Sequence, residues 1–228
     1  MSIYDKSSLV LIPSGTKTGK VFSQKPVSGD GDFTFTRASA ATRVNADGNI
    51  EKETSNLLTY SNDLSNGVWN HTDASSTGGQ SGYDGSNDAW LLNSSSGSNS
   101  LRRDISVIGI NTFSLYAKAG TANGIRIRFD QDTDCNAYID LTDGSVFTEG
   151  NTLSINVYPI SGGWYRISVA MNNIGLNLFR LIVTDGTTTT TAGTIYIQDA
   201  QLEQGLVARE YIETTTTAVY GGITDNTP

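Results

Sequence analysis

Aromatic side chains in polar segments are the residues of this sequence best suited to contact a ligand. Sugar recognition needs a flat aromatic face beside groups that form hydrogen bonds. Tyr83 meets this need, because it lies in a loop-like segment, residues 81–85, that has no apolar pattern. Trp90 and Trp164 are further candidates, but strand-like segments surround them and a core position explains them equally well. We therefore predict glycan contacts at Tyr83, Trp90 and Trp164.

Clustered carboxylates suggest a second kind of site. Asp130, Asp132 and Asp134 alternate along a short segment, and calcium binds clustered carboxylate oxygens. The EF-hand template does not fit, because Cys135 stands where that loop needs glycine and Leu141 where it needs glutamate. Two interpretations stay open for this segment, a looser calcium site and a solvated loop at the end of a strand.

Catalysis has little support in the sequence. His71 is the only histidine, so a Ser-His-Asp or Cys-His site would have to use it. It lies in a polar segment, and no nucleophile elbow occurs in the chain. Glycoside hydrolysis needs two positioned carboxylates, but pairs arise by chance among 23 acidic residues. We predict that the chain is not an enzyme and requires no cofactor.

The composition indicates an all-β protein. Of the 228 residues, 37% are hydrophobic and only 17% are charged, and 24 are glycine. A disordered acidic chain or a coiled coil would carry far more charge. The net charge of −8 argues against nucleic-acid binding, which needs a basic surface. The apolar run 9–12 before Pro13 is too short for a signal peptide or a membrane span, so we expect no membrane insertion.

Residues 1–56 differ from the remainder of the chain. Residues 1–53 carry seven basic and six acidic side chains, whereas residues 54–228 carry eight and seventeen. Residues 33–37 alternate like a strand, and the segments 42–45 and 49–52 flank an Asp-Gly pair typical of a hairpin. No independent core is evident, so we predict an attachment arm ordered by contacts with a partner. The residues expected to make these contacts are Phe33, Phe35, Arg37 and Arg43.

Residues 57–213 show the two-residue period of β-strands in at least five segments. Asp143-Gly144, Gly162-Gly163 and Asp185-Gly186 stand where strands should reverse. The pattern predicts a sandwich or barrel, followed by an extended tail, residues 214–228. The side chains expected to form one apolar layer are Phe113, Leu115, Ile125, Ile127, Phe129, Ile167, Val169, Leu181, Val183, Ile195 and Ile197. Those expected to face solvent or a neighbouring subunit are Ser114, Lys118, Arg126 and Arg128.

Several segments resemble the tail-associated and fibre proteins of bacteriophages. Asp32–Gly48 is similar to the start of many such proteins, and to virion proteins of gut phages related to crAssphage. The segments similar to their jelly-roll domain are Asn56–Asp63 followed by Trp69, Ser114–Gly120, Gly163–Ile167, Asp199–Gly205 and Tyr211–Val219. Together they cover most of the chain.

The resemblance implies a jelly-roll β-sandwich akin to galactose-binding and carbohydrate-binding modules. It also implies assembly with identical subunits, with a homotrimer favoured. In related modules an aspartate on the last strand often binds a structural calcium, and Asp199 is similar in position. In longer relatives the chain continues beyond the equivalent of Pro228 into another β domain.

Two functions follow as expectations. The first is a non-enzymatic virion structural protein, a head fibre, tail fibre, decoration or tail-associated subunit that attaches through its N-terminal arm to other phage virion proteins. Such a protein would be made in the host bacterial cytoplasm and carried on the virion. The alternative is a lectin-like adsorption protein that binds a glycan on the host surface.

Overall fold

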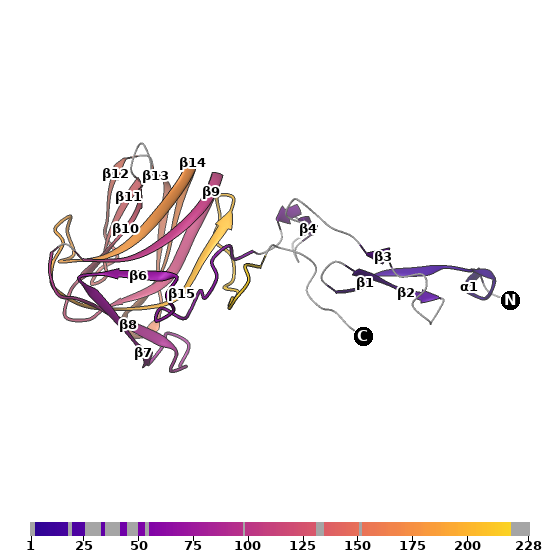
Figure 1. Cartoon of the computed structure of the whole chain (residues 1–228), viewed down its shortest axis with the longest axis horizontal. Coiled ribbons are helices and arrows are strands. Elements are labelled where there is room, and N and C mark those ends of the chain that lie inside the picture. Colours follow the sequence, from indigo (N-terminus) through magenta and orange to yellow (C-terminus); the bar gives the residue numbers. More distant parts are fainter. Residues whose placement is uncertain are drawn as a thin grey trace. The chain divides into compact units, whose positions relative to one another are not determined.

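The chain divides into two compact units. The computed structural model describes residues 3–17, 20–25, 33–34, 42–44, 50–52, 55–97, 99–130, 135–150 and 152–219. One unit is Asn56–Val219, and the other combines Met1–Ser55 with Tyr220–Pro228 (Figure 1). Each unit is described by itself. No helix among the described residues is long and apolar enough to cross a membrane.

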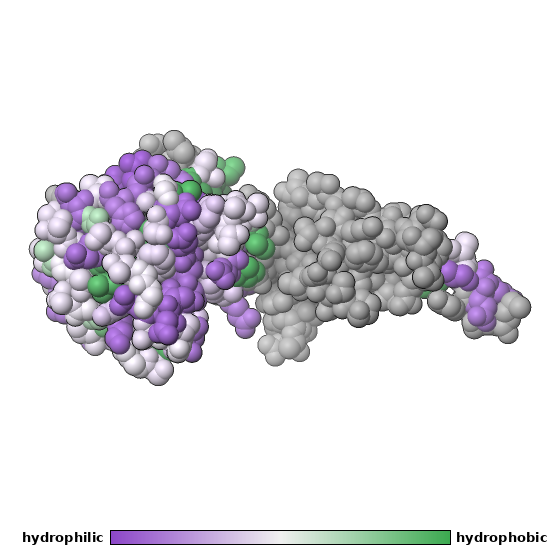
Figure 2. All heavy atoms as spheres, turned by 60° about the horizontal axis from the view of Figure 1, so that its bottom comes forward, coloured by the Kyte–Doolittle hydropathy of each residue, from purple (hydrophilic) through white to green (hydrophobic). Residues whose placement is uncertain are grey.

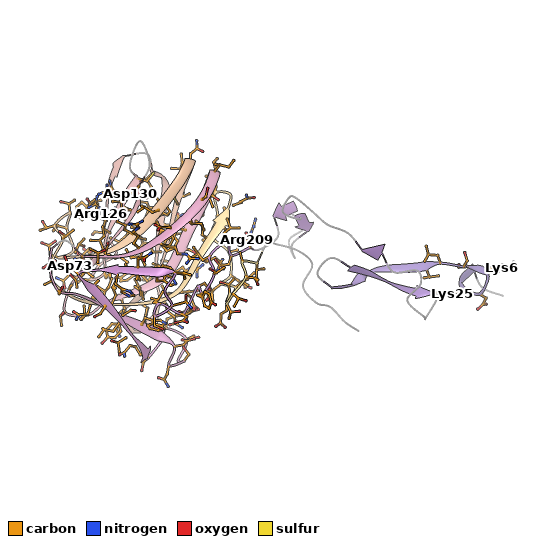
Figure 3. The ribbon with its side chains drawn as sticks, viewed as in Figure 1. Lys6, Lys25, Asp73, Arg126, Asp130 and Arg209 are labelled. Carbon is orange, nitrogen blue, oxygen red and sulfur yellow. The ribbon has the colours of Figure 1, made fainter. Side chains whose placement is uncertain are left out.

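The unit that holds the N-terminus contains short antiparallel pairings. Its elements are α1 (Ile3–Lys6), β1 (Val10–Lys17), β2 (Lys20–Lys25), β3 (Phe33–Thr34), β4 (Thr42–Val44) and β5 (Ile50–Lys52). Strands β1, β2 and β3 form one sheet, and Lys25 Nζ donates to the Asp5 carbonyl at 3.2 Å (Figure 3). Strand β4 pairs with β5, which confirms the predicted hairpin, although its turn lies outside the described residues.

The predicted attachment residues stay untested. Phe35 and Arg37 lie outside the described residues. Phe33 is on β3 and Arg43 on β4, where the backbone alone is described. Their role in attachment therefore stays a prediction.

The larger unit is built from antiparallel strands. They are β6 (Trp69–Thr72), β7 (Ala74–Gln80), β8 (Ala89–Ser94), β9 (Ser100–Ala119), β10 (Gly124–Asp130), β11 (Cys135–Asp140), β12 (Val146–Gly150), β13 (Thr152–Pro159), β14 (Trp164–Thr184) and β15 (Gly193–Gln204). A short 3₁₀ turn, Ser161–Gly163, joins β13 to β14. Gly144, Gly162, Gly163 and Gly186 have positive φ, which confirms that the chain reverses at the predicted Gly-containing turns.

Two long strands fold the sheet into two layers. Strands β9 and β14 pair with each other from Lys118–Trp164 to Leu101–Leu181. The second half of β9 also pairs with β15, and its first half pairs with β6. The first half of β14 pairs with β13 and its second half with β10. Gly109 adopts a φ of 74° in the middle of β9, a conformation that favours glycine.

The result is a jelly-roll β-sandwich, as predicted. One layer, named the front layer whatever the view, runs β13–β14–β9–β15–β8–β7, and the other, named the back layer, runs β12–β11–β10–β14–β9–β6 (strand labels in Figure 1). Polar residues dominate the surface of this unit in Figure 2, with apolar residues scattered among them. This polar surface matches the low charge and frequent Ser, Thr and Asn of the sequence.

The core lies between the layers. All eleven predicted core side chains are buried, none more than 2% exposed, which confirms the predicted strand facing. Phe113 of the front layer meets Phe179 of the back layer with ring centroids 4.6 Å apart, and Phe129 lies 5.7 Å from Phe179. Burying a large apolar side chain contributes roughly 1.5–3 kcal/mol, so these residues dominate the stability of the unit.

One expected outward residue is buried. Lys118, Arg126 and Arg128 are partly exposed, but Ser114 is fully buried. The Arg166 guanidinium covers it, donating to Ser114 Oγ at 3.0 Å and to the Arg209 carbonyl at 2.8 Å. The segment after β15 therefore lies across this part of the front layer, and the expectation for Ser114 was wrong.

Asn56 joins the two ends of the larger unit. Its side chain is fully buried and makes four hydrogen bonds to the backbone. Nδ2 donates to the carbonyls of Ala200 (3.2 Å) and Ile212 (2.9 Å). Oδ1 accepts from the amides of Leu58 (3.1 Å) and Leu202 (3.2 Å). The first residue of the unit is thus bonded to its last strand.

The C-terminal boundary differs from the expected one. Thr214 is buried and its hydroxyl donates to the Leu58 carbonyl at 2.6 Å. Val219 exchanges backbone hydrogen bonds with Asn56 at 2.8 and 2.9 Å. Residues 214–219 therefore belong to the larger unit, whereas the sequence predicted a tail from residue 214.

Candidate ligand groove

A row of three large side chains crosses the front layer. Lys118 of β9 lies in register with Trp164 of β14 on one side and with Tyr196 of β15 on the other. Ile195 and Ile197 point into the core, so the two-residue period places Tyr196 on the outer face. The core pattern of β15 thereby fixes where this tyrosine lies.

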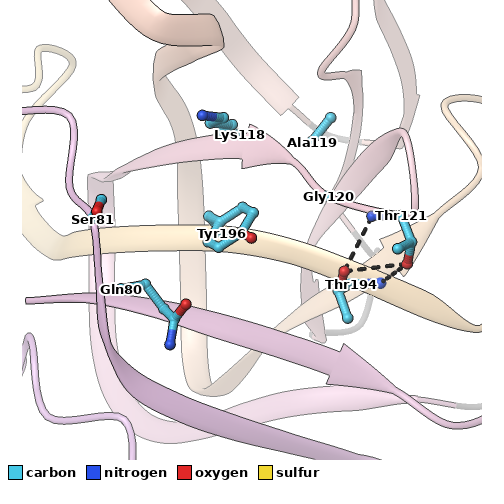
Figure 4. Close-up of a pocket in the computed structure, with 8 residues that line it drawn as sticks. All are labelled: Gln80, Ser81, Lys118, Ala119, Gly120, Thr121, Thr194 and Tyr196. Carbon is cyan, nitrogen blue, oxygen red and sulfur yellow. Dashed lines mark hydrogen bonds between the residues drawn. The ribbon is translucent and has the colours of Figure 1, made fainter.

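A groove of about 530 Å³ opens beside Tyr196. Its lining residues are Gln80, Ser81, Lys118, Ala119, Gly120, Thr121, Thr194 and Tyr196. The Tyr196 ring lies between Lys118 and Gln80 (Figure 4). The groove thus combines one aromatic ring with hydroxyl, amide and ammonium groups.

Hydrogen bonds fix one end of the groove. Thr121 and Thr194 each donate a backbone amide to the other's hydroxyl, at 3.1 and 2.9 Å (Figure 4). Gly120 lies against the same strand, where a Cβ would come within 2.4 Å of the Thr194 carbonyl. Only glycine allows this close approach, so the threonine pair holds a defined position.

Tyr83 lies beside the groove in an aromatic stack. Its ring is 3.5 Å from that of Tyr116 at an interplanar angle of 10°. The Arg166 guanidinium lies 4.5 Å from the centre of Tyr116. The Tyr83 hydroxyl donates to Asp199 Oδ2 at 3.0 Å. Tyr83 therefore uses one face and its hydroxyl within the protein, and its predicted contact with a glycan stays untested.

Gln198 anchors the loop that carries Tyr83. Gln198 Oε1 accepts from the Tyr83 amide at 3.1 Å, and Nε2 donates to Asp88 at 2.7 Å. Ser81, at the start of this loop, lines the groove. The buried Gln198 therefore helps to hold the edge of the groove in place.

Asp199 occupies a strained position in the last strand. Its φ is 58°, and it lies where the pairing of β15 with β9 shifts register. Burial raises the pKa of its carboxyl to about 6, although the hydrogen bond from Tyr83 opposes this rise. Burial likewise raises the pKa of Tyr83. Asp and Asn tolerate positive φ better than most residues.

The described surroundings of Asp199 do not fit a calcium site. Calcium takes about six to eight oxygen ligands. Among the described residues, no three His, Cys, Asp or Glu side chains gather in a way that could hold a metal ion. The Asp199 carboxyl instead accepts the Tyr83 hydroxyl.

The two predicted tryptophans serve packing. Trp164 is 3% exposed and has an edge contact with Tyr83 and a tilted contact with Tyr196, so it offers no open ring face. Trp90 is half-buried, and its Nε1 donates to the Asn62 carbonyl at 2.9 Å. A Cβ on Gly78 would lie 3.1 Å from the Trp90 ring, so the strand packs closely on it. Trp164 is therefore buried, as the core interpretation expected, and the predicted glycan contact of Trp90 stays untested.

Sequence reasoning missed the residues that line the groove. Tyr196 was not considered, although it alternates with two core isoleucines and had to face outward. Lys118 was placed correctly on the outer face but was not linked to a site. The threonine pair joins strands far apart in sequence, and no local signal predicts it.

His71 lies near a serine, but the pair is not arranged for nucleophilic catalysis. His71 is exposed, and its Nε2 lies 2.9 Å from Ser76 Oγ. The Ser76 hydroxyl donates its proton to the Leu64 carbonyl at 2.9 Å. The imidazole must therefore donate to Ser76, the reverse of what a general base does. Partial burial lowers the pKa of His71.

The aspartate cluster is described only at its start. Asp130, labelled in Figure 3, bridges Arg128 and Arg180, and its Oδ2 lies 2.7 Å from Arg180 Nε. Asp132 and Asp134 lie outside the described residues, so the calcium interpretation of that segment is untested. Asp130 itself is occupied by ion pairs.

Comparisons with known proteins give little further information. No protein-family model and no curated protein matches the chain. Among solved structures, one similar chain is the N-terminal endo-1,4-beta-D-xylanase 10B of Clostridium thermocellum, comprising CBM22-1 and GH10 modules complexed with xylohexaose. The match has a TM-score of 0.40 and 14% identity, and covers 67% of this chain and 28% of that one. A likeness at this level carries no argument about function.

Proposed function

We propose that the sandwich is a non-enzymatic glycan-binding module. The observation that carries the proposal is the groove beside Tyr196. Tyr196 is partly exposed, and such a ring can stack on the apolar face of a sugar while nearby polar groups bond its hydroxyls. The volume of about 530 Å³ falls within the range of roughly 300–1,000 Å³ that is usual for small-ligand sites.

The polar groups suit a polyhydroxylated ligand. Gln80 offers both amide donors and an acceptor, and Ser81, Thr121 and Thr194 offer hydroxyls. Hydroxyl-rich sugars need both kinds of partner. The threonine pair is already positioned by its own backbone bonds, which reduces the entropy lost on binding.

The groove favours binding without turnover. Hydrolysis of a glycoside uses two carboxyl groups on either side of the bond. The lining residues include no aspartate, glutamate or histidine. We therefore expect incubation with a bound glycan to release no reducing ends.

A glycan array tests this proposal. Wild-type protein should bind a subset of glycans, and Tyr196→Ala should lower the signal about tenfold or more. Stacking of a nucleic-acid base on one aromatic ring contributes on the order of 1–3 kcal/mol, and we expect a similar size for a sugar. The matched control is Tyr158→Ala, which removes an exposed tyrosine of β13 that does not line the groove. Absence of any glycan signal, or full binding by Tyr196→Ala, would refute the proposal.

A second candidate role is that of a virion structural protein. The phage-like segments of the sequence favour it, above all Asp32–Gly48 in the N-terminal unit. We propose that this unit attaches the chain to other virion proteins and that the chain assembles as a homotrimer. Deleting residues 1–55 should leave a folded sandwich that no longer enters particles. Light scattering of the purified chain at micromolar concentration should give three times the monomer mass, and a stable monomer would count against the trimer.

A further inference from the structure

The groove carries a positive charge although the chain as a whole is negatively charged. The protein has a net charge of −8, yet Lys118 is the one charged side chain among the residues that line the groove. A neutral glycan needs no cation. The presence of Lys118 therefore points to a negatively charged group on the ligand. This inference rests on the proposed glycan binding.

Lys118 is held at the groove by aromatic neighbours. Its Nζ lies 5.9 Å from the centre of the Tyr196 ring, and Trp164 flanks it in register on the opposite strand. Its stem passes Gly163, where a Cβ would lie 3.9 Å from Lys118 Cε. Among the described residues, no carboxylate forms an ion pair with Lys118.

We propose that the groove selects a sugar that carries a carboxylate, such as a uronic or sialic acid. The Tyr196 ring stacks on the sugar ring, and the Lys118 ammonium donates to the carboxylate. A hydrogen bond between two charged groups is roughly twice as strong as a neutral one. A neutral sugar would cover the ammonium without offering it an anion, so the lysine also discriminates against neutral ligands.

Matched pairs of ligands test this selectivity with the full chain. Oligogalacturonate is compared with the corresponding neutral galactan oligomer, and sialyllactose with lactose, by array binding followed by calorimetry. Wild-type protein should prefer the anionic member of at least one pair by about threefold to fivefold, the effect expected of one partly exposed charge pair. Lys118→Met should reduce this preference to near one, whereas Lys118→Arg should keep most of it.

The control removes a cation from the other layer. Arg102→Met takes away a partly exposed charge on β9 that does not line the groove, and it should leave the preference unchanged. Equal binding of neutral and anionic ligands overturns the inference but leaves glycan binding intact. An anionic preference that survives in Lys118→Met also overturns it, because the anion would then bind elsewhere. Absence of binding to every sugar refutes the proposed function and this inference with it.

Discussion

The two outer faces of the sandwich use the same strand pattern for different surfaces. On the front layer, the row formed by Lys118, Trp164 and Tyr196 borders a groove. On the back layer, a row of three arginines follows the register from Arg102 through Arg180 to Arg128. Both rows lie opposite buried apolar residues of the same strands. The two faces differ in their outward side chains, and only the front row borders a described groove.

The three arginines of the back row form ion pairs with two aspartates. Arg102 bonds Asp104 at 2.7 Å, and Asp130 bridges Arg128 and Arg180. Partly exposed ion pairs of this kind contribute only about 0–1 kcal/mol each. The charged groups of the back row are occupied by one another, whereas the aromatic ring of Tyr196 borders a groove. The proposed glycan binding is therefore expected at the front face.

The largest expected effect falls on the core that both layers share. Ile127→Asp places a charge at a fully buried position of β10. A buried unpaired charge costs several kcal/mol, on the order of the whole stability of a domain. We expect the sandwich to lose its cooperative thermal transition, as followed by circular dichroism. A variant that melts normally would show that the inward facing of β10 is misassigned.

The second-largest effect on stability is expected at Asn56, which joins the two ends of the larger unit. Asn56→Ala removes four hydrogen bonds and leaves buried backbone groups without partners. We expect the free energy of unfolding to fall by about 2–4 kcal/mol in denaturant titrations. Asn93→Ala, at an exposed position of β8, is the control and should change it by less than about 0.5 kcal/mol. Similar small changes in both variants would contradict the role of Asn56.

A smaller effect is expected on the pH dependence of stability, because of Asp199 on the last strand of the front layer. The pKa of Asp199 is raised to about 6 from an ordinary value of 3.8. The folded state therefore binds this proton more tightly than the unfolded state, and the contribution of Asp199 to stability rises as the pH falls from about 7 to about 4. Asp199→Asn should melt higher than wild type at pH 7, and this difference should shrink toward pH 4.

Glu203 also has a raised pKa, so the difference between the two proteins is the informative quantity. Burial also raises the pKa of Glu203, whereas hydrogen bonds from Ser145 lower that of Asp143. A difference in melting temperature that does not change with pH would contradict the assignment to Asp199. A chelator should leave the wild-type melting temperature unchanged, because the described residues around Asp199 do not fit a calcium site.

The smallest effect should come from the back face. Arg128→Ser removes one arm of the bridge at Asp130 while Arg180 remains. We expect the free energy of unfolding to fall by no more than about 1 kcal/mol, since the pair is partly exposed. A loss as large as that of Asn56→Ala would mean that the back face is a structural network rather than a solvated surface.

The sequence predicted the parts of the fold that depend on local alternation. Residues such as Ile125, Ile127 and Phe129 follow the two-residue period, and this period alone decides which side of a strand faces the core. Ser114 follows the same rule but is covered by a segment about ninety residues later, which no local pattern reveals. A segment distant in sequence can pack over an outward-facing side chain. The alternation of apolar and polar residues therefore predicts which side of a strand faces the core, but not whether the other side is exposed.

The candidate site was predictable only in part for the same reason. Tyr83 was recognised as a loop aromatic, but its stacking on Tyr116 and its bond to Asp199 depend on strands distant in sequence. The outward position of Tyr196 could be inferred from its neighbours. The groove could not, because β7, β9 and β15 must first assemble to form it (Figure 4).

The most direct test of the account compares the two faces in one calorimetric titration. The full chain is titrated with a glycan that binds on the array, as wild type, Tyr196→Ala and Arg180→Ala. The account predicts that Tyr196→Ala weakens binding about tenfold or more, whereas Arg180→Ala binds like wild type. Loss of binding in Arg180→Ala with full binding by Tyr196→Ala would place the site on the back layer and contradict the account.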